Sequence, residues 1–330
     1  MSDSYYIFSP GELKRKDNTI EIIKVDGTKL DIPIERVKDL YIFSEMNFNT
    51  KLLGLMAQHG ICVHMFNYYE HYIGSFIPKT SYVSGDLLVK QVIYYIDKSK
   101  RLAIAKEFVN AASFNIFRNL KYYDRRNKNL EEEINIIRTL RDTISTSKTI
   151  TELMGIEGSI RKHYYSAWNT IINSDIEFDK RVKRPPDNII NSLISFLNSV
   201  LYAKALTEIL KTQLNPCISY LHEPSDKRYS LILDVTEIFK PLIVDRLIFT
   251  FLNKKIIDDR DFVEEVGYLK IKENSVKKIM QHFEERMKTT IHHKQLNREV
   301  SYQYLIRLEA YKLIKHLYEE KPYEGFKIWW

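Results

Sequence analysis

The 330-residue chain has few of the residues that mark specialised scaffolds: two cysteines, ten glycines, nine prolines and three tryptophans. Cys62 and Cys217 lie far apart and form no CxxC pair, which excludes a disulfide framework and suits a reducing compartment. No basic segment followed by an apolar core opens the sequence, so no signal peptide is visible. Charges interrupt the apolar stretch at 231–252 and exclude a bilayer span there. We therefore expect a cytoplasmic protein without a membrane partner.

The composition is that of a globular protein, with 44% hydrophobic and 28% charged residues, and the length suits two domains. The formal net charge of +7 is spread unevenly. Residues 1–80 hold 9 basic and 10 acidic side chains, whereas residues 81–330 hold 41 and 33. The basic second part suggests an anionic partner, and nucleic acid is the first candidate. A protein that is basic without any such partner is the alternative.

The first eighty residues have the pattern of β-strands. Asp26-Gly27, between apolar runs at 19–25 and 30–34, is a strong two-residue hairpin signal. Asn49 and Gly60 are suited to cap and to end a single short helix. Further strands are expected at 5–8, 39–43, 61–66 and 72–76.

The rest of the chain has a helical pattern. Apolar positions recur every three and four residues, and only five of the ten glycines lie beyond residue 80. The predicted fold is α+β, with a small β-rich domain over 1–80, a linker at 81–86 and a larger all-helical domain over 87–330. Helices are expected at 86–120, 130–145, 149–173, 187–214, 229–255, 274–288 and 300–319.

Two motifs in the helical part place polar groups where the pattern favours apolar ones. Glu157 lies on or beside the apolar stripe of its helix, and Gly155 and Gly158 leave space at the backbone around it. A helix-surface ion pair with Arg161 is the alternative. His222 follows an apolar residue and precedes a proline-containing turn, although a lone histidine is more often structural than a ligand.

A third motif carries three acidic residues in an apolar segment. Asp234 and Glu237 are three residues apart and Asp245 lies eleven residues after the first, so all three are expected to point roughly the same way. Pro241 between them should kink the helix. Partly buried carboxylates need a cation, either arginine, lysine or a metal. Two carboxylates and one imidazole from separate segments would suit Mg²⁺ or Mn²⁺, and a buried Arg–Asp network is the alternative.

Basic residues also gather outside these motifs, among them a cluster at 118–128 that includes two tyrosines. Aromatic rings among cations suit nucleic-acid ends, and a solvated helix end is the alternative. His292 and His293 are expected in a loop or in contact with DNA.

In their order along the chain, the three motifs resemble those of the CRISPR-associated endonuclease family Cas-one, the spacer-acquisition integrases. The resemblance covers the whole chain and extends to 60–66 and 108–118. The motif residues that carry it are Glu157, Gly158, Arg161, Tyr164, Tyr165, Leu221, His222, Arg228, Ser230, Leu231, Asp234, Glu237, Lys240, Pro241 and Asp245.

The resemblance implies a metal site. Glu157, His222 and Glu237 would bind one Mg²⁺ or Mn²⁺ ion, and Asp234 would be a further acidic catalytic residue beside it. Lys240 stands where the family more often has arginine, which weakens bidentate contacts at that position. The residues implied to contact DNA are Arg161, Tyr165, Lys227, Arg228 and Lys240.

The implied function is metal-dependent cutting and joining of DNA, in which a captured fragment enters a CRISPR array by 3′-hydroxyl attack on the repeat. The implied partners are double-stranded DNA, a second copy of the chain bound through residues 1–80, and the small protein Cas-two. Two alternatives stay open: a non-catalytic nucleic-acid scaffold of the same fold, and an unrelated helical hydrolase of small phosphate esters. Separation of the Glu157, His222 and Glu237 side chains by more than a ligand's reach, or an arginine filling the gap between them, would end the nuclease assignment.

Overall fold

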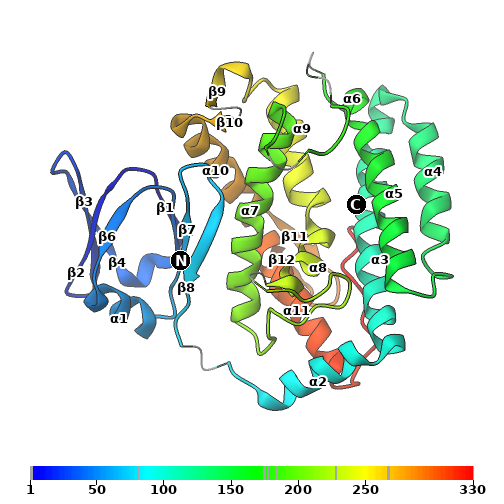
Figure 1. The fold of residues 1–330 in the computed structure, drawn as a ribbon, viewed down its shortest axis with the longest axis horizontal. Helices are drawn as coiled ribbons and strands as arrows, with labels where there is room; N and C mark the ends of the chain where they lie inside the picture. Colours follow the sequence, from blue (N-terminus) through cyan, green and yellow to red (C-terminus); the bar gives the residue numbers. More distant parts are fainter. Residues whose placement is uncertain are drawn as a thin grey trace. The chain divides into compact units, whose positions relative to one another are not determined.

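The structure is a computed structural model that describes residues 3–79, 82–173, 176, 178–182, 185–226, 229–265 and 268–329. The chain divides into two compact units, Met1–Ser81 and Tyr82–Trp330, which are described separately here (Figure 1). Strands dominate the first unit and helices the second, so the predicted α+β class is confirmed.

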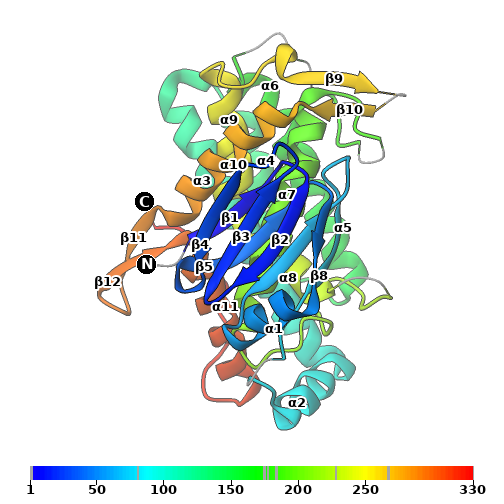
Figure 2. The same ribbon diagram turned by 90° about the vertical axis from the view of Figure 1, so that its left-hand side faces the viewer.

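The first unit contains two four-stranded sheets, ordered β1-β5-β7-β8 and β4-β3-β2-β6 (Figure 2). One helix, α1 (Thr50–Gln58), joins their apolar residues in a single core that includes Leu13, Leu40 and Leu52. The strands are β1 (Asp3–Ile7), β2 (Gly11–Lys16), β3 (Thr19–Lys24), β4 (Lys29–Pro33), β5 (Val37–Ile42), β6 (Met46–Phe48), β7 (Cys62–Phe66) and β8 (Tyr72–Phe76), with a 3₁₀ turn η1 (Ile34–Arg36).

Local signals predicted this unit well. β3 and β4 pair antiparallel across the expected turn, where Gly27 has φ +82° and the Asp26 carboxylate accepts the Thr28 N–H at 2.9 Å. Asn49 caps α1 by accepting the Leu52 N–H at 3.2 Å. The sequence analysis missed β2, because its GELKRK sequence buries only Leu13 and has no apolar alternation.

The second unit is mostly helical. Its helices are α2 (Gly85–Ile96), α3 (Lys98–Tyr123), α4 (Glu131–Asp142), α5 (Ile150–Ser166), α6 (Trp168–Ile171), α7 (Ile189–Leu210), α8 (Ser230–Phe239), α9 (Arg246–Asn253), α10 (Glu273–Lys288) and α11 (Tyr302–Leu317), with π-helical segments η2 (Asp124–Lys128) and η3 (Pro241–Asp245) and a 3₁₀ turn η4 (Asp259–Asp261).

The prediction of an all-helical domain was wrong in one respect. Two antiparallel hairpins interrupt the helices, β9 (Phe262–Glu265) with β10 (Tyr268–Ile271), and β11 (Thr290–His293) with β12 (Arg298–Ser301). Strands of four residues are too short for a clear alternating pattern. His292 and His293 therefore lie on a strand and not in the predicted loop.

Two predicted long helices are interrupted. Asp97 ends α2 and caps α3, because its carboxylate accepts the N–H groups of Ser99 and Lys100 at 2.9 Å. Pro241 opens a π-helical segment instead of a simple kink, and within it the Asp245 N–H donates to the Lys240 carbonyl at 3.1 Å. This π-turn sets the direction in which Asp245 points relative to Glu237.

Among the described helices, only α7 is long and apolar enough to cross a membrane by length and composition, and 78% of its apolar window is buried inside the structure. The 231–252 stretch is instead divided among α8, η3 and α9. Glu208 of α7 is fully buried and accepts a hydrogen bond from Gln303 of α11 at 2.8 Å. This burial and pairing are typical of a core helix.

Candidate active site

The residues of the three motifs meet in the second unit, where α3 packs against both α5 and α8 (Figure 1). Asn119 of α3 is fully buried at this junction. Its side-chain amide donates to the Tyr164 hydroxyl at 3.2 Å and to the Pro241 carbonyl at 2.6 Å. One polar side chain therefore ties α5 to the π-turn that follows α8.

Asp234 is fully buried and holds the loop that precedes α8. Its carboxylate accepts the backbone N–H groups of Tyr220 at 2.7 Å, Leu221 at 2.9 Å and His222 at 3.0 Å. It also bonds Nδ1 of the His222 ring at 2.8 Å. Both carboxylate oxygens are thus engaged, by the backbone at 220–222 and by the His222 ring.

The same loop is held from α3 by a residue that the sequence analysis did not single out. Arg101 donates from Nε to the Tyr220 carbonyl at 2.8 Å and from Nη2 to Glu223 at 2.7 Å. No local signal identifies this arginine, because its partners lie more than a hundred residues along the chain.

Arg161 lies between the two glutamates. Its Nε is 3.3 Å from Glu157 Oε1, its Nη2 bonds Glu237 Oε2, and its Nη1 is 3.9 Å from Asp245 Oδ2. Lys240, one turn after Glu237, bonds the other oxygen of that carboxylate. A guanidinium thus fills the gap between Glu157 and Glu237, which is the arrangement expected of the scaffold alternative.

We call Glu157, Arg161, His222, Glu237, Lys240 and Asp245 the acidic cluster. The charges of this cluster shift the pKa values of Glu157 and Glu237 in opposite directions. Burial and the neighbouring Glu237 raise the pKa of Glu157. Burial also acts to raise the pKa of Glu237, but Lys240 and Arg161 outweigh it and hold that pKa far below its usual range. Glu237 is therefore ionised at neutral pH, and Glu157 holds its proton more strongly.

The pKa values of Asp245 and His222 are also raised. Burial raises the pKa of Asp245 to about 7, despite Arg161 nearby. For His222, burial acts to lower the pKa, but the hydrogen bond that its ring makes to Asp234 and the charges of Asp234 and Glu237 outweigh burial and raise the pKa.

The donor chemistry of this cluster fits a divalent ion. Two carboxylates share one cationic group, and because Asp234 holds Nδ1 of His222, Nε2 is the ring nitrogen available to a ligand. Oδ2 of Asp245 is also buried without a hydrogen bond. In the described part of the chain, however, no three His, Cys, Asp or Glu side chains already lie at metal-binding spacing. An ion would have to replace Arg161 between the glutamates.

The remaining predicted residues are placed as follows. The ring of Tyr165 packs edge-on against Trp168 and Phe178, at ring-centroid distances of 5.3 and 5.4 Å. Gly155 and Gly158 are exposed, and a Cβ at either position would meet no neighbouring atom within 4 Å, so α5 is open around Glu157. Lys227 and Arg228 lie outside the described residues.

The sequence is similar to that of known proteins over its whole length. Residues 5–285 match the family model of CRISPR associated protein Cas1. A CRISPR-associated endonuclease Cas1 from Fusobacterium nucleatum is 56% identical over 330 residues, covering 100% of this chain and 98% of that protein. One from Thermodesulfovibrio yellowstonii is 48% identical over 328 residues, covering 99% of each chain.

Solved structures agree with the sequence matches. A Cas1 protein from Thermotoga maritima has a TM-score of 0.87 at 36% identity, covering 98% of this chain and 100% of that one. A chain of a Cas6-RT-Cas1–Cas2 complex has a TM-score of 0.85 at 16% identity, covering 100% of this chain and 36% of that one, which shows a shared fold alone.

Proposed function

The chain belongs to the Cas1 family of CRISPR-associated proteins, and from this premise we propose that it is a metal-dependent DNA endonuclease and integrase. In the proposed reaction the 3′-hydroxyl of a captured DNA fragment attacks a phosphodiester of a CRISPR repeat. A new P–O bond forms, the repeat's own 3′ oxygen leaves, and the fragment becomes a spacer. The proposal is supported by the relatives named CRISPR-associated endonucleases and by Glu157 and Glu237, which lie on either side of Arg161.

Glu157, Glu237 and His222 would hold Mg²⁺ or Mn²⁺, an ion that stabilises charge on a phosphate and activates a hydroxyl. The protein's own groups prepare the site. Asp234 fixes the His222 ring, and the low pKa of Glu237 keeps its carboxylate ionised. Once released from the glutamates, Arg161 and Lys240 are available to phosphate oxygens.

DNA can approach this site from the open side of α5. Gly155 and Gly158 are exposed on either side of Glu157, with no neighbouring atom where a Cβ would lie. A phosphate backbone therefore meets no side chain at these two positions. Glycine inside a helix costs roughly 1 kcal/mol relative to alanine, and contacts with a closely approaching DNA backbone would offset that cost.

The test is Glu157→Ala, assayed for Mn²⁺-dependent cleavage of branched DNA. Cleavage should be lost while the circular dichroism melt stays close to that of the unmodified protein, because the Glu157 side chain is 27% exposed and supports little of the core. Glu132→Ala removes an equal charge from the exposed side of α4 and serves as the matched control. Unchanged cleavage in Glu157→Ala would rule out the proposal.

A non-catalytic scaffold is the second candidate, and the Arg161 bridge between Glu157 and Glu237 is the observation in its favour. A scaffold would bind DNA in a salt-sensitive way but would be indifferent to divalent ions. Titration of the DNA-free protein with Mn²⁺, followed by its thermal unfolding, separates the two. A rise in melting temperature that Glu157→Ala abolishes supports the metal site, and no rise in either protein supports the scaffold.

We further propose that the protein acts in the cytoplasm as a homodimer formed through the β-rich residues 1–80, with a small Cas2-like partner. The support is family membership and the shared fold with a chain of the Cas6-RT-Cas1–Cas2 complex. Light scattering of the full chain, alone and mixed with a Cas2 protein, measures both associations. A monomer that ignores the partner would contradict this part of the proposal.

A further inference from the structure

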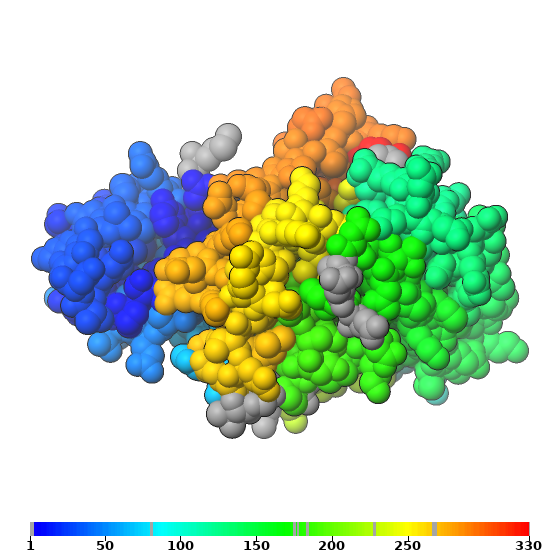
Figure 3. All heavy atoms as spheres, turned by 90° about the horizontal axis from the view of Figure 1, so that it is seen from above, coloured from blue at the N-terminus to red at the C-terminus, as the bar shows by residue number. Residues whose placement is uncertain are grey.

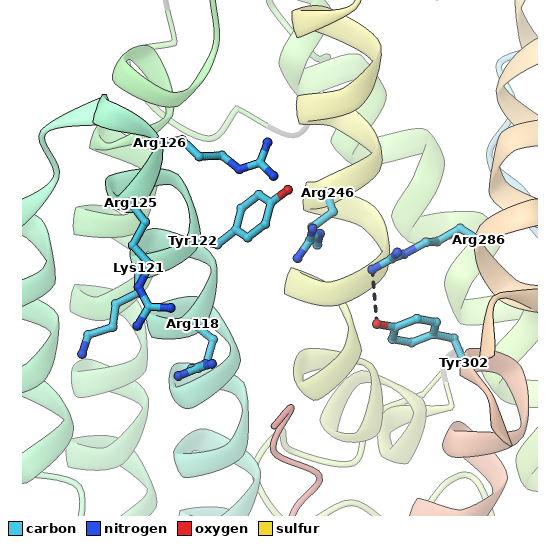
Figure 4. A pocket seen from close by; sticks show the side chains of 8 residues that line it. All are labelled: Arg118, Lys121, Tyr122, Arg125, Arg126, Arg246, Arg286 and Tyr302. Atoms are coloured by element: carbon cyan, nitrogen blue, oxygen red, sulfur yellow. Dashed lines mark hydrogen bonds between the residues drawn. The ribbon is translucent and has the colours of Figure 1, made fainter. Parts of the chain in front are cut away.

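A strongly basic pocket lies in the second unit, apart from the glutamates. It has a volume of about 490 Å³ and opens between the end of α3 with η2 on one side and α9, α10 and α11 on the other (Figure 4). In Figure 3 the teal, yellow and orange segments that supply it reach the same face of this unit. The lining residues are Arg118, Lys121, Tyr122, Arg125, Arg126, Arg246, Arg286 and Tyr302.

The positive charge of the pocket has little internal compensation. Six of the eight lining residues are cations and none is acidic. Within the described residues, Arg118, Lys121 and Arg125 form no ion pair, and neither do Arg126 and Arg286. Nε of Arg118 is buried without a hydrogen-bond partner. Like charges gathered in one concave site whose lining contains no acidic residue favour the binding of an anion.

Several of the guanidinium groups are already held in place. Arg126 and Arg246 both lie over the Tyr122 ring, at 4.3 and 4.6 Å from its centroid. Arg286 donates to the Leu242 carbonyl, at 3.0 Å from Nε and 2.6 Å from Nη2, and lies 4.5 Å from the Tyr302 ring centroid. Stacked arginines lose little further freedom when they bind a phosphate, and they present paired N–H donors to it.

We infer that this pocket binds a terminal phosphate or polyphosphate of nucleotide size. The volume lies within the range of a single small-molecule ligand and is too small to admit a duplex. A phosphodiester contributes one negative charge, whereas a terminal phosphate carries about 1.5 to 2 at neutral pH, and a polyphosphate more. The lining has six cations and no acidic residue, so it matches the higher charge of a terminal phosphate or polyphosphate better than the single charge of a phosphodiester.

Two sources present this chemistry: the 5′-phosphorylated end of a DNA strand, and a free nucleotide. Neither depends on the glutamates, because the lining includes no residue of that cluster. The inference therefore goes beyond the proposed function. Binding should also persist in EDTA and in Glu157→Ala, so failure of the proposed nuclease would not affect the result.

The experiment uses the full chain in EDTA. Fluorescence anisotropy compares one single-stranded oligonucleotide with a 5′-phosphate and the same strand with a 5′-hydroxyl, and calorimetry measures the binding of ATP. We expect at least one phosphorylated ligand to bind about tenfold more tightly than its unphosphorylated counterpart, adenosine in the case of ATP. Arg118→Gln and Arg125→Gln should each remove most of that preference.

Arg138→Gln is the matched control, because Arg138 is an exposed arginine of α4 that does not line the pocket. It should leave the preference unchanged, and circular dichroism melts identify any variant that fails to fold. A preference confined to the phosphorylated strand identifies a strand end, and one confined to ATP identifies a free nucleotide; either supports the pocket. Equal affinity with and without phosphate for both ligands, or equal losses in Arg138→Gln, would overturn the inference.

Discussion

The acidic cluster and the basic pocket are both concentrations of charge in the second unit, but they balance that charge differently. The cluster contains its own counter-ions, since Arg161 and Lys240 bond Glu237. In the pocket six cations face one another without an acid. The charge of the cluster is therefore compensated from within, whereas the acid-free lining of the pocket suits an external anion. The cluster is made of Glu157, Arg161, His222, Glu237, Lys240 and Asp245.

Two residues that are adjacent in sequence belong to different regions. Asp245 ends the π-turn and approaches Arg161, whereas Arg246 begins α9 and lies over the Tyr122 ring of the pocket. Consecutive helical side chains diverge by about 100°, so one stretch of backbone can serve two faces. The two sites can therefore be altered independently even though their residues are neighbours in sequence.

Among the changes that should separate the two regions, His222→Ala is expected to have the largest effect, which is a loss of DNA cleavage. Loss of a ligand nitrogen should reduce Mn²⁺-dependent cleavage by more than the roughly 100-fold that is typical of changes behind a metal ligand. Binding to the basic pocket in EDTA should be unchanged. Single-turnover cleavage and anisotropy measure the two effects on the same protein. His59→Ala, a change at an exposed histidine of the first unit, is the control and should match the unmodified protein in both assays.

Asp234→Asn should have the next largest effect. The amide supplies one acceptor where three backbone N–H groups and the His222 ring now meet a carboxylate. We expect a destabilisation of about 1–3 kcal/mol in urea unfolding and a loss of about 10–100-fold in Mn²⁺ affinity. An unchanged Mn²⁺ affinity would show that orientation of His222 by Asp234 does not matter.

Salt should affect the regions unequally. Raising the salt concentration from 50 to 200 mM should weaken binding of the phosphorylated ligand by about tenfold, as expected when roughly two phosphate charges are neutralised. The melting temperature should change little, because the ion pairs of the cluster are mostly buried and poorly screened. Parallel titration and melting series over this range measure both. A melting temperature that also falls strongly as salt rises would mean that the ion pairs of the cluster are as open to solvent as the pocket.

The smallest expected effect is the pH dependence of Asp245→Asn. Burial raises the pKa of Asp245 to about 7, so between pH 4 and pH 7 the folded state holds a proton that the unfolded state has lost. The free energy of unfolding of the unmodified protein therefore falls as pH rises through this range. The asparagine variant does not titrate there and should gain stability relative to the unmodified protein from pH 5 to pH 8, on the order of 1 kcal/mol or more.

Asp258→Asn is the control for this series. Hydrogen bonds from Arg260 lower the pKa of Asp258 to about 2, so its carboxylate is ionised in both states above pH 5. The stability of the Asp258→Asn variant relative to the unmodified protein should therefore not vary between pH 5 and pH 8. A flat profile for Asp245→Asn as well would contradict a buried, proton-holding Asp245.

Local sequence signals succeeded where a few consecutive residues decide the structure. The turn at Asp26-Gly27 and the cap at Asn49 depend on backbone groups within three residues, and both form as predicted. The predicted helix over 86–120 was too long, because apolar periodicity continues across Asp97 and hides its role as a cap. The four short strands of the second unit gave no periodic signal at all.

The sequence by itself identified the family motifs and the residue types of the cluster, since order and spacing along one chain are enough for that. Only the tertiary structure decided that Asp234 bonds the backbone at 220–222 and that Arg161 lies between the two glutamates. It likewise joined Arg286 to the basic end of α3 in one pocket. These contacts link segments that are up to about 170 residues apart in the chain, and helix packing brings them together, which no periodicity or spacing within one segment records.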